Sequence, residues 1–122
     1  MHPLHNISQS YGALTPAMFH VLLALAGEDM HGYAILKEVK LRTGGKVRLS
    51  TGTLYGIIKR LLADGLIAEL RARPAEREDD ERRKYYRLTP LGRQLAAAEA
   101  ERMEEVLAVA RARHLLKRAH TA

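Results

Sequence analysis

Apolar side chains recur at three- and four-residue steps in three short runs in the first half of the chain, which predicts three amphipathic helices. The first run begins at Thr15 and Pro16, where threonine can cap free amide groups and proline has the backbone angle of a first helical position. Each run closes on glycine, which is typical of a helix end. The predicted helices extend from Thr15 to Gly27, from Gly32 to Gly44-Gly45, and from Ser50 to Asp64-Gly65.

Two short β-like runs follow, Leu66–Leu70 and Lys84–Leu88, and together they predict a two-stranded hairpin. The segment between them, Arg71–Arg82, is polar and charged. Its tip, Pro74–Glu81, is too polar to belong to a core. The hairpin is therefore predicted to have a long, exposed tip.

A fourth and much longer helix is predicted after the hairpin, because Leu88-Thr89-Pro90 repeats the start signal Leu14-Thr15-Pro16. If it runs to about Arg118, it is roughly 43 Å long, more than a small domain can cover with its own core. Its apolar side then needs a second chain, or it folds back on the first helix; both can hold at different points. The residues predicted to form a dimer interface are Leu95, Met103, Val106, Leu107 and Ala110.

Three helices followed by a β ribbon are the order of a winged helix-turn-helix. The predicted fold class is mainly α with a small two-stranded β wing, extended by a long C-terminal dimerisation helix. The predicted organisation is an N-terminal arm (1–13), a winged helix-turn-helix DNA-binding domain (14–89) and the C-terminal dimerisation helix (90–122).

Composition and charge narrow the function classes. The 122 residues fit one compact domain, and the absence of cysteine excludes disulfides and thiolate or cysteine-metal chemistry. The net charge of +6 favours a polyanionic partner, and the stretch Lys46–Ala63 contains four basic residues and no acidic one. A solvated basic face is the alternative interpretation. The sequence contains no recognisable secretion signal and no apolar stretch of membrane-spanning length, so we expect a cytoplasmic protein.

The third helix is suited to a DNA groove. The side opposite its apolar stripe carries Gly52, Gly56 and Lys59, and glycine inside a helix costs about 1 kcal/mol relative to alanine. The two glycines therefore suggest a close approach by another surface, unless they are simply tolerated near the helix start. We expect Thr51, Thr53 and Tyr55 nearest the bases and Arg48, Lys59 and Arg60 on phosphates, with Ser50 adding a hydroxyl at the helix start.

The base of the hairpin is the second predicted contact with DNA. Arg83 and Lys84 beside Tyr85 would lie where a wing meets the backbone or the minor groove. The tip is acidic and would be repelled by phosphate. Only the base is therefore expected to contact DNA.

The chain resembles the PadR family of bacterial winged-helix regulators. The resemblance implies a homodimer joined through the C-terminal helix, which binds an inverted-repeat operator, usually as a repressor relieved by a signal. It resembles the short subgroup with one helix after the wing, and Tyr33 joins the predicted DNA-binding residues as part of a matching motif. Thr51 stands where relatives commonly carry proline. The residues that carry the resemblance are Leu14-Thr15-Pro16, His31-Gly32-Tyr33-Ala34-Ile35, Leu49-Ser50-Thr51-Gly52-Thr53-Leu54-Tyr55-Gly56, Arg60-Leu61, Asp64-Gly65-Leu66-Ile67 and Tyr85-Tyr86-Arg87-Leu88-Thr89-Pro90-Leu91-Gly92.

Other functions are weighed against this one. The sequence does not support an enzymatic function. Val47 follows Lys46 where a phosphate-binding loop needs Ser or Thr, and no serine lies in a nucleophile elbow. The histidines lack metal-ligand spacing, so no metal or cofactor is expected. A winged-helix protein-interaction module with a basic surface stays open, and an RNA reader is disfavoured by the few aromatic residues. A small-molecule effector of unknown identity would fit between the long helices, unless Met103 and Leu107 fill that space.

Overall fold

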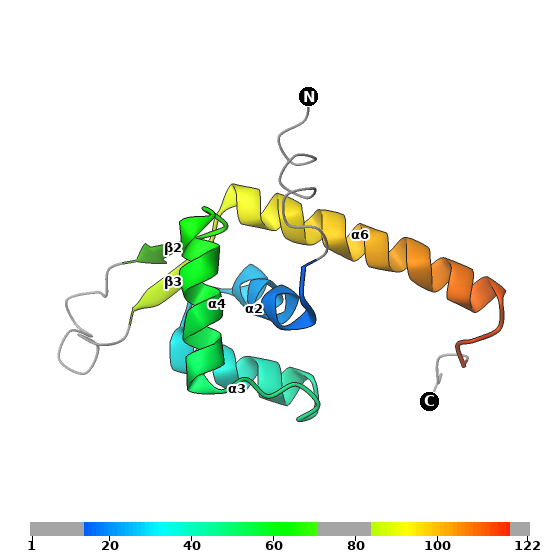
Figure 1. The fold of residues 1–122 in the computed structure, drawn as a ribbon, viewed down its shortest axis with the longest axis horizontal. Helices are drawn as coiled ribbons and strands as arrows, with labels where there is room; N and C mark the ends of the chain where they lie inside the picture. The colour runs from blue at the N-terminus through cyan, green and yellow to red at the C-terminus, as the bar shows by residue number, and fades with distance from the viewer. Residues whose placement is uncertain (1–13, 71–83, 118–122) are drawn as a thin grey trace.

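The computed structural model describes residues 14–70 and 84–117. In this part of the chain, helices dominate and a small antiparallel sheet accompanies them, so the predicted class, mainly α with a β wing, is confirmed. The N-terminal arm, the hairpin tip and Arg83 lie outside the described residues. The elements are α2 (Pro16–Gly27), β1 (Met30–His31), α3 (Gly32–Arg42), α4 (Thr51–Ala63), β2 (Ile67–Leu70), β3 (Tyr85–Leu88) and α6 (Pro90–Ala112). Figure 1 labels all of them except β1.

Side-chain caps begin the four described helices. Thr15, Ser50 and Thr89 accept hydrogen bonds from the backbone amides of Met18, Thr53 and Gly92, as the start signals predicted. The cap of α3 was not predicted: Nδ1 of His31 accepts from the amide of Ala34 at 3.2 Å. Histidine is an uncommon cap, so the residue pattern carries little signal for it.

Left-handed residues end three of the helices. Gly44 after α3 and Gly65 after α4 have positive φ, and the paired backbone hydrogen bonds around them form the Schellman motif. The same motif ends α6 at His114, where Leu115 donates to the carbonyl of Ala110. The helix therefore stops at Ala112 and not near Arg118, because a histidine takes a conformation that sequence reasoning assigns to glycine.

The sheet has one strand more than the predicted hairpin. β3 lies in the centre and pairs antiparallel with β2, with Ile67 opposite Leu88. The two-residue strand β1 pairs with its other edge, with Met30 opposite Tyr86. A strand of two residues is too short to produce an alternating pattern, so only the folded chain reveals it.

A single core joins the helices and the sheet. It centres on α2, which packs against α3, β3 and the first part of α6. In Figure 1, α6 extends well past these elements, so its far half lies away from the core. The largest fully buried side chains are Leu22, Ile35, Leu54, Leu61, Leu66, Val21 and Val39.

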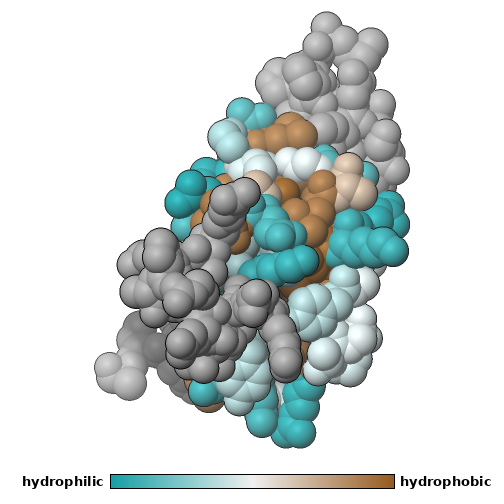
Figure 2. All heavy atoms as spheres, turned by 90° about the vertical axis from the view of Figure 1, so that its left-hand side faces the viewer, coloured by the Kyte–Doolittle hydropathy of each residue, from teal (hydrophilic) through white to brown (hydrophobic). Residues whose placement is uncertain are grey.

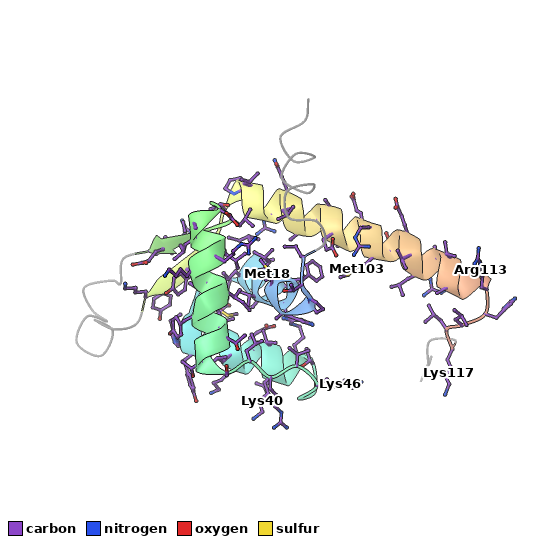
Figure 3. All side chains as sticks on the ribbon, viewed as in Figure 1. Met18, Lys40, Lys46, Met103, Arg113 and Lys117 are labelled. Carbon is purple, nitrogen blue, oxygen red and sulfur yellow. The ribbon has the colours of Figure 1, made fainter. Side chains whose placement is uncertain are left out.

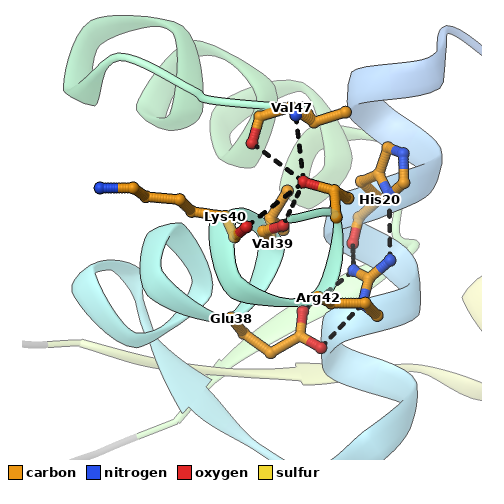
Figure 4. A network of polar contacts seen from close by, with 7 residues as sticks. His20, Glu38, Val39, Lys40, Arg42 and Val47 are labelled. Atoms are coloured by element: carbon orange, nitrogen blue, oxygen red, sulfur yellow. Dashed lines mark hydrogen bonds and ion pairs between the residues drawn. The ribbon is translucent and has the colours of Figure 1, made fainter. Parts of the chain in front are cut away.

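A polar network connects α2 with α3 and with the loop before α4 (Figure 4). The guanidinium of Arg42 forms two hydrogen bonds with Glu38 and two with His20, one of them to the His20 carbonyl. Thr43 donates to the carbonyl of Val39 at 2.8 Å and accepts from the amide of Val47 at 3.0 Å. His20 is therefore half-buried and hydrogen-bonded to α3. The loop that leads into α4 is attached to the end of α3 by the hydrogen bond between Val47 and Thr43.

Candidate nucleic-acid interface

One side of α4 is buried and the opposite side is open. Leu54, Ile58 and Leu61 lie in the core. A Cβ atom added at Gly52 or Gly56 would meet nothing within 4 Å. Both glycines therefore lie on the exposed side, as the helical projection predicted. No side chain covers the α4 backbone at these two positions, so a DNA groove could approach it closely.

The start of α4 offers hydroxyl and amide donors without nearby carboxylates. Ser50 accepts from the amide of Thr53 at 3.0 Å, and its hydroxyl donates to Oγ1 of Thr53 at 2.9 Å. The Thr53 hydroxyl thus accepts one hydrogen bond, and its own proton can be donated to another group. Thr51 is exposed beside it, and the first turn contains no acidic residue. A helix N-terminus of this kind favours a negative partner.

Tyr55 packs on the start of α3. Its ring lies over Gly32, the first residue of α3, so closely that a Cβ atom there would collide with the phenol oxygen and would approach Cζ to 2.9 Å. The side chain is 45% exposed. Tyr55 therefore fixes the angle between α3 and α4 at the edge of the open face, besides any contact with bases.

Two of the three predicted phosphate-binding cations near α4 have described partners. Arg48 donates from Nε to the carbonyl of Gly45 at 3.2 Å, which holds its guanidinium beside the loop. Arg60 pairs with Asp64 at 3.4 Å on the solvent side of α4. Lys59 is exposed on the side that carries the two glycines. The local charge is therefore positive at the centre of the face and partly neutralised at its C-terminal edge.

The predicted residues from α3 and β3 lie beside the start of α3. Tyr85 packs edge-to-face on the His31 ring at 5.3 Å, and Lys84 pairs with Glu69 on the neighbouring strand at 3.7 Å. Tyr33 is exposed, with the Lys37 ammonium 5.4 Å from its ring centre. The face of the molecule that Figure 2 shows is a mixture of hydrophilic and hydrophobic residues where it is not grey. Through His31 and Tyr85, the structure joins the base of the wing to the helix-turn-helix.

Sequence reasoning missed two lysines beside this surface and included a third, Lys46, only as part of the basic stretch Lys46–Ala63. Lys37 and Lys40 lie on the exposed side of α3, and Lys46 lies in the loop that follows. In Figure 3, Lys40 and Lys46 stand at the far end of α3. The signal was present, because Lys37 and Lys40 are three residues apart on the side opposite Ile35 and Val39. Their charges extend the positive surface beyond α4.

The two alternatives for the long helix apply to different parts of α6. Leu95 is 3% exposed and belongs to the chain's own core, so its assignment to a dimer interface is corrected. Met103 is partly buried against that core, and Ala110 is half-buried. Val106 and Leu107 are 55% and 46% exposed. The helical projection could not separate the buried residues of α6 from the exposed ones. It shows on which side of the helix a residue lies, but not where along the helix the core ends.

Residues 14–70 and 84–117 contain no candidate for a metal site or for a membrane-spanning helix. No group of three or more histidine, cysteine or acidic side chains there could hold a metal ion. Within the same described segments, no helix has both the length and the apolar character needed to cross a bilayer.

Comparison with known proteins identifies a family of transcriptional regulators. Residues 21–98 match the model of the "Transcriptional regulator PadR-like family". Transcriptional regulator Rv3488 of Mycobacterium tuberculosis is 36% identical over 88 residues, which cover 71% of this chain and 75% of that protein. An uncharacterised 37.1 kDa protein in transposon TN4556 of Streptomyces fradiae is 39% identical over 87 residues, or 71% of this chain, but this match spans only 23% of the Streptomyces protein.

A solved structure has the same architecture. The PadR family transcription regulator from hypervirulent Clostridium difficile R20291 aligns with a TM-score of 0.65 at 26% identity. The alignment covers 77% of this chain and 93% of that one. The overall winged-helix fold is therefore shared with a solved regulator.

Proposed function

The chain belongs to the PadR-like family of transcriptional regulators, and we propose that it acts as a homodimeric repressor that binds an inverted-repeat operator in double-stranded DNA. The family implies DNA binding, and its members regulate transcription and are generally not enzymes. The observation that carries the proposal is the open face of α4, where Gly52 and Gly56 leave the backbone bare.

The proposed reading surface consists of α4 and the segments beside it. Thr51 and Thr53 at the helix start would reach base edges, which require side chains that donate and accept hydrogen bonds. Lys59 and Arg48 would contact phosphates on either side of the groove. We assign DNA binding to residues 14–89, with Ser50, Tyr55, Arg60, Tyr33, Lys84 and Tyr85 at the margins of this surface and Arg83 in the segment outside the described residues.

The proposed dimer seam is the far half of α6. Val106, Leu107 and Val109 are about half exposed on a helix that extends past the core (Figure 1). A row of large apolar side chains in this position is stabilised when a second copy covers it. Residues 90–122 would then join two copies, and each copy would present one α4 to successive major grooves on one side of the duplex.

Repression would follow from occupancy. A dimer with two helices in successive grooves covers about one helical turn between their centres. Where such a site overlaps a promoter, the bound protein prevents access by the transcription machinery without any further surface. This mechanism needs only the DNA-binding face and the seam.

The experiment is a fluorescence titration with duplex DNA from the region upstream of the protein's own gene, repeated at several salt concentrations. Sequence preference together with a steep loss of affinity at higher salt supports the proposal, because Lys and Arg contacts release counterions from phosphates. Weak binding that is the same for random duplex and depends little on salt would reject it and favour the winged-helix protein-interaction module.

A further inference from the structure

The beginning of α6 is attached directly to the end of α4 by backbone groups. Gly65 and Leu66 follow α4 and expose their carbonyl oxygens toward Thr89, the residue that caps α6. The Thr89 hydroxyl donates to the Gly65 carbonyl at 2.8 Å, and the Thr89 amide donates to the Leu66 carbonyl at 3.1 Å. No side chain separates the two helix ends at this point. We call these four residues, Gly65, Leu66, Thr89 and Gly92, the α4–α6 joint.

Gly92 allows this close approach. A Cβ atom at Gly92 would collide with the Leu66 carbonyl oxygen and would lie 2.9 Å from both the Leu66 carbonyl carbon and Cδ1 of Leu88. The Leu66 carbonyl belongs to a backbone that is fixed on both sides, by the left-handed turn at Gly65 and by the pairing of Ile67 with Leu88. Any side chain at position 92 must therefore displace α6 and not the turn.

A single hydroxyl takes part in both the start of α6 and its attachment to α4. Oγ1 of Thr89 accepts from the amide of Gly92 at 3.0 Å while it donates to Gly65. The same atom thus begins α6 and attaches it to the turn that ends α4. The direction of α6 relative to α4 depends on these contacts together with the packing of Leu95 and Ala96 in the core.

We propose that the α4–α6 joint, through Gly92 and Thr89, determines which half-site spacing the protein selects. This inference rests on the proposed function, in which α6 forms the seam and α4 enters the groove. With the seam held, a rotation at the joint moves the far end of α4. The helix has 13 residues and is about 20 Å long, so a rotation of about 10° moves its N-terminal end by about 3.5 Å. That displacement equals about one base-pair step.

The test uses the full chain and a pool of duplexes that carry a random half-site and its inverted copy, separated by every spacer length up to one helical turn. Gly92→Ala and Thr89→Val are compared with the unchanged protein. Gly27→Ala is the matched control, because a Cβ atom there meets nothing within 4 Å. Circular dichroism and sedimentation first identify the folded dimeric variants, and Thr89→Val keeps the shape of the side chain in case Gly92→Ala does not fold.

We expect the unchanged protein and Gly27→Ala to select one spacing. The joint variants should select the same half-site sequence but a different or broader set of spacings, with affinity for the original spacing lower by about tenfold or more, because two-site binding is lost when the geometry does not match. A folded dimeric joint variant that selects the original spacing as sharply as the unchanged protein would overturn the inference. If the unchanged protein selects no inverted repeat at all, the proposed operator arrangement fails, and the inference fails with it.

Discussion

The Glu99 side chain is buried on α6, with an exposed fraction of 8%, and its carboxylate accepts two hydrogen bonds from the guanidinium of Arg102, at 2.6 and 3.1 Å. Glu99 and Arg102 lie one turn apart, just before α6 leaves the core. The ion pair raises the pKa of Arg102, first through the hydrogen bonds and then through the charge of Glu99. The pair therefore keeps a buried negative charge satisfied at this point.

Arg102→Met should lower the free energy of unfolding, because it leaves the Glu99 carboxylate buried without its partner. The double variant Glu99→Met with Arg102→Met should recover most of this loss, because it removes the buried charge as well. Urea unfolding of the four proteins in the cycle measures the coupling. Equal losses in the single and double variants would contradict the pairing.

Lys59→Ala should weaken binding to all duplexes alike and reduce the salt dependence of affinity by about one unit of slope, because the exposed Lys59 contacts a phosphate in the proposed complex. Lys117→Ala is the control, since Lys117 stands at the far end of the molecule, beyond α6 (Figure 3). Fluorescence titration at several salt concentrations gives both slopes. Unchanged affinity of Lys59→Ala for random duplex would reject the phosphate contact.

Thr53→Ala should instead reduce discrimination between the operator and random DNA, because Thr53 is placed at base edges in the proposed complex. The variant also removes the acceptor of the Ser50 hydroxyl at the start of α4, so thermal unfolding must show that the helix is intact. The measured quantity is the ratio of the two affinities. A parallel loss on both duplexes would assign Thr53 to the DNA backbone.

Gly56→Leu should abolish operator binding while the melting temperature stays the same or rises. A leucine here projects into open space and obstructs the approach of a groove, and leucine forms helix more readily than glycine. Thermal unfolding and DNA titration of the same sample provide the two readings. A strongly lowered melting temperature with intact DNA affinity would mean that this face is covered by protein.

Leu107→Glu should convert the proposed dimer into a monomer, because a charge in the seam loses its hydration when a second copy covers it. Ala108→Glu adds the same charge at an exposed position on the other side of α6 and should leave the dimer intact. Sedimentation velocity distinguishes the two outcomes. A Leu107→Glu chain that still sediments as a dimer would move the seam elsewhere.

The unfolding free energy should decrease as the pH falls below 6.5. Burial lowers the pKa of His20, the charge of Arg42 lowers it further, and Glu38 partly opposes this. The unfolded chain then binds a proton at a higher pH than the folded one, so the stability from neutral His20 is complete above 6.5 and declines below it. His20→Gln should show a smaller decline in urea unfolding measured across this range. An identical decline in both proteins would assign it to other groups.

Local signals in the sequence predicted the elements well. Thr15, Ser50 and Thr89 cap helices as expected, and the apolar stripe of α4 faces the core with Gly52 and Gly56 opposite. These features depend on a residue and its neighbours within one or two turns, and that range is what periodicity and capping describe. The family resemblance rests on the same local motifs.

Only the tertiary structure decided how these elements meet. It covered Leu95 but left Val106 exposed, placed Tyr55 over Gly32, added β1 to the sheet and brought Gly92 against the Leu66 carbonyl. Most of these relationships are contacts between residues that are far apart in the sequence. The difference between Leu95 and Val106 depends on where the core ends along α6. A helical pattern determines which side of a helix is apolar, whereas the partner that covers that side is determined by the packing of the whole chain.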